Sequence, residues 1–430
     1  MRNKSMEFIT TALAVGVALS AVAGYGIHKK SRKGNDCRLA RAEYVQEYID
    51  ENFVDDIAAY TSVKESTSNK NGLFPSAKAA YVAEKESGIA VFEKESTKHL
   101  PIASMCKIMT LLLSFEAIDN GVITMDEEIT VSENAASMGG SQVFLEENGK
   151  YPVRELLKSI VVCSANDSCV AMAERIAGSD SLFVDKMNDR AKALGCENTL
   201  FANCTGLPKE PQYSCAKDVA SMLSALLEHS EYYELGKIWT DTFQHPEGRT
   251  TEISNTNRLV RFYEGCDGGK TGFTNEAGFC LAATAKRGNM RIISVVIGEP
   301  DSKTRFKEVS ESFDYTFANY TMQTVVDASK QLEESVFVSG GKDKRLPIQP
   351  QRNGFLFLKR GESCDYQLQT ELFSGLKAPI CKGEEVGTIH IYYNGIEYDN
   401  IPLIATQNIE KAGYFDALRD VANAWNFNGK

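Results

Sequence analysis

The sequence predicts an α+β protein in which one sheet is assembled from both ends of a domain, followed by a second, mostly β domain. Three observations support this prediction. Period-2 alternation begins at Ala77, apolar helical patterns fill the stretch from 104 to 227, and strand-forming runs return after Lys270. Strands on both sides of a block of helices are typical of an α+β domain. Near residue 325 the pattern changes to short apolar runs separated by turns, which indicates a new domain.

Size and composition agree with two folded domains plus termini. The chain has 430 residues, of which 43% are hydrophobic and 24% are charged, as in ordinary globular proteins. Its formal net charge of -11 argues against a nucleic-acid partner, because such a protein needs a basic face to neutralise phosphates. No nucleic acid is therefore expected among its partners.

The first 36 residues are interpreted as a signal peptide or an N-terminal membrane anchor. Two basic residues precede an apolar stretch from Phe8 to Ile27, which contains the small-residue triplet 21–23. The stretch is long enough to span a bilayer, and four basic residues follow it between positions 29 and 33. If it were an uncleaved anchor, the positive-inside rule would place the bulk of the chain in the cytoplasm. Cleaved export and anchoring both remain open at this point.

Residues 37–72 read as a helix followed by a polar linker, and residues 73–325 as the first folded domain. This domain begins with a hairpin between 77 and 92. The helix that starts near Ser104 is apolar nearly all round and is therefore expected to be buried. The other expected elements are helices at 153–162, 167–176, 216–227 and 304–320, and strands at 278–285 and 291–297.

Residues 326–408 are predicted to form a β-rich domain, with Asn394-Gly395 as a hairpin turn. Residues 409–430 then place aromatic and aliphatic side chains on one stripe at helical spacing, which indicates an amphipathic tail helix. Such a helix can lie on a membrane surface or pack on the β domain. Both interpretations stay open.

The eleven cysteines are not expected to form a disulfide framework, because an odd number cannot pair completely. Cys106, Cys163 and Cys169 lie inside apolar helical patterns, where a free cysteine acts as a small hydrophobic residue. No pair has the spacing of a zinc site. The sequence therefore predicts free thiols, no metal site and no cofactor, and it suggests an owner that lives under reducing or anaerobic conditions.

The first motif with chemical potential is Ser104-Met-Cys-Lys107. An offset of three residues puts a hydroxyl and an amine on one helix face, about a turn apart. A lysine beside an apolar helix loses hydration, so its pKa falls and the neutral amine can accept the serine proton. The motif alone is weak, because a capped helix with an ordinary lysine looks the same.

The second motif is Ser164-Ala-Asn166, which lies between two helical patterns. Residues two apart do not share a helix face, so both side chains reach one cleft only if the backbone turns there. Simple capping of the helix that starts at Asp167 is the alternative interpretation.

The third motif is Lys270-Thr271-Gly272, which precedes a strand-forming run. A cation and a hydroxyl at a strand edge can hold a peptide's terminal carboxylate, and the peptide itself can bind by strand addition. Gly272 is expected to leave room for the substrate backbone. A surface turn before a hairpin is the alternative.

The three motifs occur in order, 60 and then 106 residues apart, each in the setting that its role requires. Together they form the signature of penicillin-binding proteins and class A β-lactamases. The chain resembles the low-molecular-mass penicillin-binding proteins, which are the D-alanyl-D-alanine carboxypeptidases of peptidase family S11. The resemblance covers about residues 75–325 and includes Asn203-Cys-Thr-Gly-Leu207, Asn255-Thr-Asn-Arg-Leu259 and the stretch 269–278. The β-rich domain with its tail helix also resembles that family's C-terminal half.

This resemblance implies the fold of serine β-lactamases and DD-peptidases, an antiparallel sheet with a helical cluster. It implies removal of the terminal D-Ala from peptidoglycan stem pentapeptides through an acyl-enzyme, and covalent inhibition by β-lactams. The implied roles are nucleophile for Ser104, proton acceptor for Lys107, relay to the leaving amine for Ser164 and amide donor for Asn166. Lys270 and Thr271 would bind the terminal carboxylate. The backbone N–H groups of Ser104 and Phe273 would form the oxyanion hole.

Other functions share some of the features of a carboxypeptidase. A serine β-lactamase shares the motifs, but no glutamate in the arrangement that activates the deacylating water is evident, and no second β domain is expected. An endopeptidase or transpeptidase differs only in what intercepts the acyl-enzyme. A non-catalytic cell-wall-binding module is disfavoured because every catalytic position is filled. Since peptidoglycan lies outside the cytoplasm, we expect export to the outer face of the membrane or the cell wall, with membrane association through the termini.

Overall fold

The computed structural model describes residues 72–332 and 335–416. The expected leader at 1–36 and the helix and linker up to residue 71 lie outside the described residues, as does most of the expected tail helix. In the described ranges, none of the helices is both long enough and apolar enough to cross a membrane.

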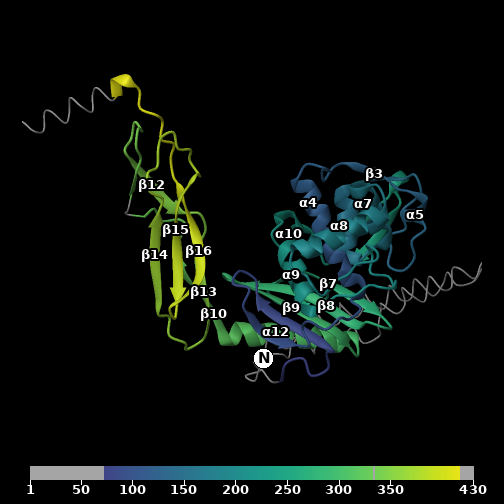
Figure 1. Cartoon of the computed structure of the whole chain (residues 1–430). Coiled ribbons are helices and arrows are strands. Elements are labelled where there is room, and N and C mark those ends of the chain that lie inside the picture. Colours follow the sequence, from purple (N-terminus) through teal and green to yellow (C-terminus); the bar gives the residue numbers. More distant parts are fainter. Residues whose placement is uncertain (1–71, 333–334, 417–430) are drawn as a thin grey trace, which may run out of the picture. The chain divides into compact units, whose positions relative to one another are not determined.

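The first domain is built on one antiparallel sheet of five strands in the order β2-β1-β9-β8-β7 (Figure 1). β1 (Ala79–Glu84) and β2 (Ala90–Lys94) come from the start of the domain. β7 (Cys266–Thr274), β8 (Gly278–Arg287) and β9 (Met290–Glu299) come from its end. The predicted α+β fold is therefore confirmed, and β7 lies at an edge of the sheet.

Both faces of this sheet are covered, and the period-2 pattern of its strands explains how. On β9, Ile292 and Val296 pack with Phe313 of α12 (Ser302–Asn319) in one core. The alternate residues, including Ile293 and Val295, pack into the larger core formed with the other helices. A strand buried on both faces reads as a continuous apolar run, as β9 does.

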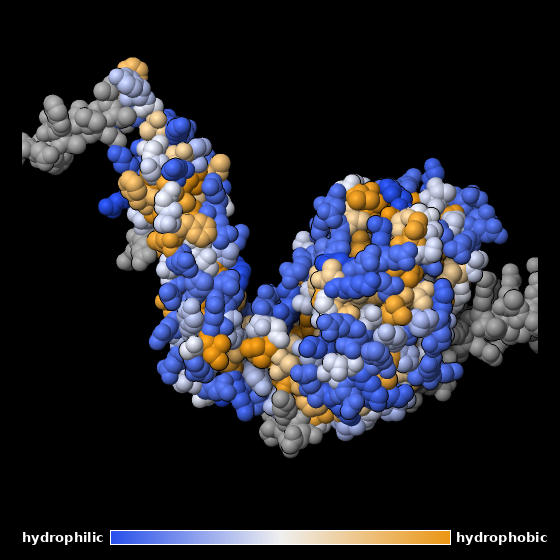
Figure 2. All heavy atoms as spheres, in the orientation of Figure 1, coloured by the Kyte–Doolittle hydropathy of each residue, from blue (hydrophilic) through white to orange (hydrophobic). Residues whose placement is uncertain are grey.

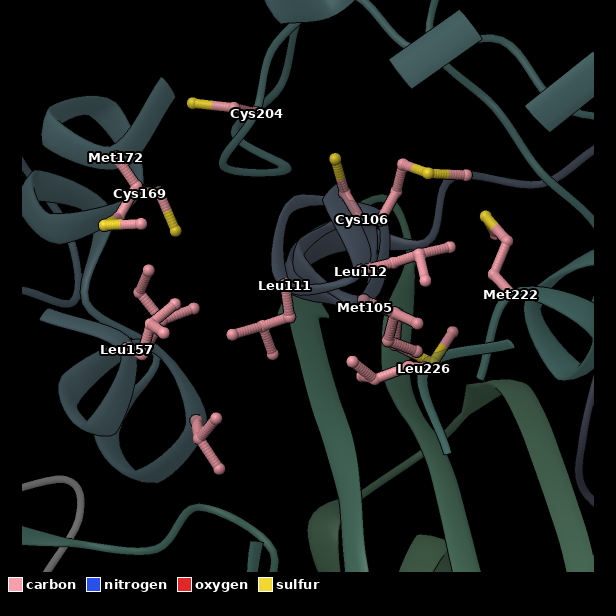
Figure 3. Packing of buried hydrophobic residues seen from close by; sticks show 14 of the residues in the cluster. Met105, Cys106, Leu111, Leu112, Leu157, Cys169, Met172, Cys204, Met222 and Leu226 are labelled. Carbon is pink, nitrogen blue, oxygen red and sulfur yellow. The ribbon is translucent and has the colours of Figure 1, made fainter. Parts of the chain in front are cut away.

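The helices that cover the other face include α4 (Lys107–Asp119), which lies in the middle of the larger core. Figure 3 shows Leu111 and Leu112 of α4 among buried side chains from neighbouring helices, such as Leu157 and Met222. The expectation that this helix is buried nearly all round is confirmed. The remaining helices are α5 (Glu133–Ala136), α6 (Val153–Cys163), α7 (Asn166–Ala177), α8 (Asp180–Ala193), α9 (Ala216–Leu226), α10 (Ser230–Gly236) and α11 (Leu259–Phe262).

Predicted helices at 153–162, 167–176, 216–227 and 304–320 agree with α6, α7, α9 and α12 to within about two residues. The structure adds α8 and α10, which the sequence did not indicate. It also adds two short hairpins, β3 (Glu128–Thr130) with β4 (Lys150–Pro152), and β5 (Thr240–Gln244) with β6 (Thr250–Ser254). One element differs in kind: Ala103–Cys106 is a short 3-10 helix, and α4 itself begins at Lys107.

The C-terminal part is β-rich, as predicted. β10 (Tyr320–Val326) pairs with β13 (Gly354–Lys359). A second sheet has the order β11-β12-β16-β15-β14 and is formed by β11 (Ser335–Phe337), β12 (Arg345–Pro350), β14 (Tyr366–Leu372), β15 (Glu385–Tyr393) and β16 (Ile396–Ala405). Asn394 and Gly395 both have positive φ between β15 and β16, which confirms the predicted hairpin turn.

The ten cysteines in the described ranges are all free. Three of them, Cys106, Cys169 and Cys204, lie in the core around α4 (Figure 3). Burial raises the pKa of each of these thiols. They therefore pack as small hydrophobic side chains. The visible face of the described residues is mostly hydrophilic, with smaller hydrophobic patches (Figure 2).

A buried pair of carboxyl groups connects the end of β9 to α12. Glu299 and Glu308 are 1% and 3% exposed, and their side chains lie close to each other. Burial and this contact raise the pKa of Glu299 to about 8, while nearby Lys94 opposes the shift and Asp301 adds to it. At neutral pH the folded protein therefore retains a proton that the unfolded chain releases.

We predict that the thermal midpoint of unfolding falls as pH rises between about 4.5 and 8. The proton on Glu299 stabilises the fold fully below 4.5, the ordinary pKa of the side chain, and this stabilisation is lost as pH rises through about 8. Glu299→Gln should flatten the profile, because the amide does not ionise. The measurement is Tm against pH for wild type, Glu299→Gln and Glu264→Gln, an exposed control. An unchanged slope in Glu299→Gln would count against this account.

Candidate active site

Ser104 and Lys107 meet at the junction of the 3-10 helix and α4. Lys107 Nζ lies 3.0 Å from Ser104 Oγ, within hydrogen-bond distance. The turn that carries the serine is unusual, because Ala103 has a φ of 47°. A residue that is not glycine adopts this conformation only where the surroundings hold it. The predicted approach of hydroxyl and amine is present in the structure.

The surroundings of Lys107 favour its neutral form. Its side chain is fully buried in the larger core, and burial lowers its pKa from the ordinary value. Lys107 Nζ also donates a hydrogen bond of 2.6 Å to the carbonyl oxygen of Thr205. A neutral amine that uses an N–H on this carbonyl can direct its lone pair at the serine hydroxyl.

The carbonyl of Thr205 is presented by a turn that Asn203 organises. Asn203 Oδ1 accepts hydrogen bonds from the backbone N–H groups of Thr205 and Gly206, at 3.1 and 2.7 Å. Its Nδ2 donates to the carbonyl of Leu207 at 2.8 Å. The Asn203–Leu207 segment therefore orients the base, a positioning role that the motif spacing alone did not reveal.

Two glycines let the backbone close around the serine turn. A Cβ on Gly206 would lie 2.1 Å from the carbonyl oxygen of Ala103, and a Cβ on Gly272 would lie 2.6 Å from that of Ile102. The expectation that Gly272 makes room for the substrate backbone needs correction. The space at Gly272 is filled by the serine turn itself, so this glycine allows β7 to approach the nucleophile.

The second motif lies at the turn between α6 and α7. Ser164 has a φ of 65° and is 4% exposed. Its Oγ is buried and has no hydrogen-bond partner among the described residues. The expected turn is therefore present, and the described part of the chain leaves this hydroxyl without a hydrogen bond.

Asn166 is the first residue of α7, and its side chain does not cap that helix, which excludes the capping alternative. Asn166 Nδ2 donates a hydrogen bond of 2.7 Å to the carbonyl oxygen of Gly139. The backbone N–H of Asn166 donates another of 2.7 Å to the carbonyl oxygen of Ser141. A Cβ on Gly140 would lie 2.8 Å from this Nδ2. Asn166 thus contacts the 139–145 loop while it stays beside the second motif.

Asp167 fixes the same loop from the other side. Its buried carboxylate accepts hydrogen bonds from the backbone N–H groups of Val143 and Leu145 at 3.1 Å each, and of Ser168 at 2.9 Å. Burial raises its pKa and these amides oppose the shift. The sequence indicated Asp167 only as a helix start. No local pattern reveals contacts to a loop more than 20 residues away.

The third motif occupies the edge strand β7. Lys270 is 1% exposed, and burial together with the charge of Lys107 lowers its pKa. The two lysines therefore lie near each other. Lys270 Nζ lies 3.2 Å from the carbonyl oxygen of Thr271, and Thr271 Oγ1 donates 2.8 Å to Thr256 Oγ1. Lys270 and Thr271 therefore lie on the edge strand of the sheet.

Phe273 follows on β7, is 48% exposed, and lies against Phe279 with the two rings tilted and their centroids 4.3 Å apart. One side chain that the sequence did not single out holds this part of the sheet. Arg305 of α12 donates to the carbonyls of Gly272 and Cys280 at 3.3 and 3.1 Å. Arg305 thereby holds β7 and β8 against α12.

The structure thus places the serine–lysine pair against β7, the strand that carries Lys270 and Thr271, and it places Ser164 and Asn166 at the turn between α6 and α7. Such an arrangement can form and break an acyl bond on a serine. Within the two described ranges, no group of three or more His, Cys, Asp or Glu side chains could hold a metal ion.

Comparison with known proteins agrees with these features. The profile of the peptidase S11 family, described as D-alanyl-D-alanine carboxypeptidase, matches residues 65–301. The profile of the penicillin-binding protein 5 C-terminal domain matches residues 320–411.

Individual relatives extend over most of the chain. D-alanyl-D-alanine carboxypeptidase DacF of Bacillus subtilis is 39% identical over 350 residues, which cover 81% of this chain and 90% of the relative. The crystal structure of penicillin-binding protein 5 from Haemophilus influenzae matches with a TM-score of 0.62 at 27% identity, over 78% of this chain and 98% of that one. Penicillin-binding protein D2 from Listeria monocytogenes, in its ampicillin-bound form, matches with a TM-score of 0.52 at 33% identity, over 57% and 99%.

Proposed function

The chain belongs to the peptidase S11 family of D-alanyl-D-alanine carboxypeptidases, and from this premise we propose that Ser104 is its nucleophile and Lys107 its general base. As a member, the protein is a serine-type peptidase that acts on peptidoglycan stem peptides and binds β-lactams covalently. The observation that carries the residue assignment is the 3.0 Å contact between Lys107 Nζ and Ser104 Oγ, with an amine whose pKa burial lowers.

In the proposed first step, Ser104 Oγ transfers its proton to Lys107 Nζ and attacks the carbonyl carbon of the penultimate D-Ala. The negative charge that develops on the carbonyl oxygen is stabilised by the backbone N–H groups of Ser104 and Phe273. Asn166 holds the amide of the substrate on the acyl side.

The proton then passes from Lys107 through Ser164 to the nitrogen of the terminal D-Ala, whose C–N bond breaks. The hydroxyl of Ser164 has no other hydrogen-bond partner among the described residues, which supports this relay role. Water attacks the resulting ester, and proton transfer in the reverse direction restores the serine. Attack of an amine on the same ester would give transpeptidation. An acyl-enzyme that neither water nor an amine attacks would persist, which is the stable adduct expected with β-lactams.

Lys270 and Thr271 are proposed to bind the terminal carboxylate at the edge of β7. The amine of Lys270 is buried, and burial together with the charge of Lys107 lowers its pKa, so a bound carboxylate would favour the charged form of this amine. Gly272 supports this site through its packing on the serine turn rather than by contacting substrate.

We predict that Lys270→Ala lowers kcat/KM for a peptide with a free terminal carboxylate by about 10- to 100-fold, the range expected for a lost hydrogen bond between charged groups. The same peptide with an amidated C-terminus should lose much less, because it offers no anion. The measurement is D-alanine or D-alaninamide release by both variants, with thermal unfolding as a check on folding. Equal losses on the two peptides would remove the carboxylate role.

Cellular location and domain limits are proposed on the same premise. The substrate lies outside the cytoplasm, so we propose export through the N-terminal 36 residues. We also propose attachment through the termini to the outer face of the cytoplasmic membrane. We propose a catalytic domain at 73–325, a β-rich domain at 326–408 and an amphipathic tail helix at 409–430. Fusing residues 1–36 to a periplasmic reporter and fractionating the cells would test the export signal.

A further inference from the structure

β14 forms one edge of the five-stranded sheet in the C-terminal part, and its outer side has no partner strand in the described ranges (Figure 1). It pairs with β15 over seven residues without a bulge, and its residues from Tyr366 to Glu371 are all exposed. The opposite edge of the same sheet, β11, has only three residues. Proteins usually protect edge strands by keeping them short, by bulges, or by proline and lysine. β14 contains neither proline nor lysine, so it is open to pairing with a further strand.

The pairing with β15 shows which backbone groups of β14 face outward. The N–H of Phe373, the residue after β14, donates a hydrogen bond of 3.0 Å to the carbonyl oxygen of Val386. Along an antiparallel pair, successive residues alternate between exchanging these hydrogen bonds with the partner strand and facing away from it. The odd-numbered residues of β14 therefore bond to β15, and the N–H and C=O groups of its even-numbered residues face the open side.

The apolar face of the sheet continues to this open edge. Leu368 lies opposite Ile391 of β15, which is fully buried in the core of the C-terminal part. On the same face, Leu368 is nevertheless 46% exposed and Tyr366 is 37% exposed. A strand added beside β14 would place its own side chains next to these two and remove apolar surface from water.

A second copy of β14 fits this edge in an antiparallel register centred on Gln369. The opposed pairs are then Tyr366–Leu372, Gln367–Glu371, Leu368–Thr370 and Gln369–Gln369. Even-numbered residues oppose even-numbered ones, so the outward backbone groups of the two copies meet. Like charges are nowhere opposed, the amide of Gln367 can donate to the carboxylate of Glu371, and the two Gln369 amides complement each other. One two-fold axis satisfies all of these pairs, which points to a second copy of this chain as the partner.

We propose that β14 is a homodimer interface, at which two copies of this chain pair their β14 strands in the register centred on Gln369. The five-stranded sheets of the two copies then form one continuous sheet. A single strand edge is a small interface, so the dimer is expected to be weak and to dissociate on dilution. The formal net charge of -11 on each chain opposes association, and salt weakens this repulsion. The catalytic residues take no part in this interface.

Disulfide trapping of the full-length chain tests the register directly. The background carries serine at Cys37, Cys364 and Cys381, so that these native thiols do not react. In this background, Gln369→Cys should form a disulfide with its own copy under mild oxidation at physiological salt. Directly opposed residues of an antiparallel pair have Cα atoms about 4.5–5.5 Å apart, which suits a disulfide. The yield of covalent dimer is measured on a non-reducing gel.

Gln367→Cys is the matched control, because it lies on the same strand and face but is not opposed to itself. In the proposed register its two copies are four residues apart along the strand, about 13 Å, which is too far for a disulfide. Gln367→Cys alone should therefore give at least about fivefold less dimer than Gln369→Cys. Mixed with Glu371→Cys, the residue opposite, it should crosslink as well as Gln369→Cys does.

Thr370→Pro, added to Gln369→Cys, tests the backbone pairing. The N–H of Thr370 faces the open side, so proline removes a donor of the dimer and none of the bonds to β15. The yield of dimer should fall about fivefold or more. Penicillin labelling at the wild-type level checks that each variant is folded. Absence of dimer from Gln369→Cys, or equal yields from Gln369→Cys and Gln367→Cys alone, would overturn the proposal.

Discussion

Replacing Ser104 by alanine is expected to abolish covalent labelling by a fluorescent penicillin and to reduce D-alanine release at least about 10⁴-fold. Acylation needs the serine oxygen as the attacking atom, and neither Lys107 nor Ser164 can substitute for it from its position. Removal of a nucleophile in comparable serine peptidases leaves only the contribution of binding and the oxyanion hole. The measurement is gel fluorescence after incubation with labelled penicillin, together with release of D-alanine from a pentapeptide.

Ser181→Ala is a suitable control for this experiment, because this serine is exposed on α8 and belongs to none of the three motifs. The control variant should be labelled stoichiometrically, as the wild type is. Labelling of Ser104→Ala at the wild-type level would show that another residue is the nucleophile.

Replacing Lys107 by alanine is expected to slow acylation by about 10²- to 10⁴-fold, the range that a general base contributes. Substrate binding should persist, because the proposed carboxylate site is on β7 and does not include Lys107. The structure gives the reason: the buried amine is the basic group that contacts Ser104 Oγ, at 3.0 Å, and burial lowers its pKa. Stopped-flow acylation by a chromogenic cephalosporin measures the rate, and competition with unlabelled peptide measures binding.

The pH dependence of acylation is a second test of Lys107 as the general base. Because burial lowers the pKa of Lys107, its amine is neutral at a pH where an ordinary lysine is charged. The acylation rate should therefore be retained below the ordinary lysine pKa and decline as falling pH protonates the amine. Lys186→Ala, on the exposed side of α8, should keep the wild-type profile. Wild-type acylation by Lys107→Ala would contradict the assignment of the base.

The elements that the sequence predicted well are those with strong, uninterrupted patterns. α4 is apolar on nearly every side, and β9 is mostly apolar and buried at every position, so burial and sequence pattern agree for both. α8 was missed because charged residues interrupt its apolar positions, and only Phe183, Met187 and Ala191 are buried. The short hairpins β3–β4 and β5–β6 were missed because strands of three to five residues give little periodic signal.

In the candidate site, too, some groups could be predicted from the sequence and others could not. The hydroxyl and amine groups of the three motifs could be predicted, because their spacing relates directly to helix faces, turns and strand edges. The groups that orient them could not. Thr205 presents a carbonyl oxygen to Lys107 from 98 residues away, and Arg305 holds β7 from 33 residues away. Backbone acceptors carry no residue-type signal, and such distances along the chain appear only in the fold.

Gly272 illustrates how a correct residue can be assigned for the wrong reason. Its membership in the third motif indicated a site with little room for a side chain. The nearest atoms to an added Cβ belong to Ile102, Met105 and Ala103, which form the serine turn. Substituting this glycine would therefore displace the nucleophile, and a loss of activity would not by itself indicate a substrate contact.

The structure and the related proteins distinguish between the alternative functions. Membership in the S11 family and the matching C-terminal domain favour a peptidase over a class A β-lactamase. A non-catalytic module is disfavoured further, because the structure places Lys107 in contact with Ser104. Endopeptidase and transpeptidase activities use the same acyl-enzyme, so the products distinguish them.

The most direct test of the central claim is mass spectrometry of the protein and its products after separate incubation with a pentapeptide muropeptide and with a β-lactam. The account predicts release of a single D-alanine from the muropeptide, and a slowly hydrolysed β-lactam adduct on the proteolytic peptide that contains Ser104. An adduct on any other peptide, or rapid turnover of the β-lactam with an intact muropeptide, would contradict it.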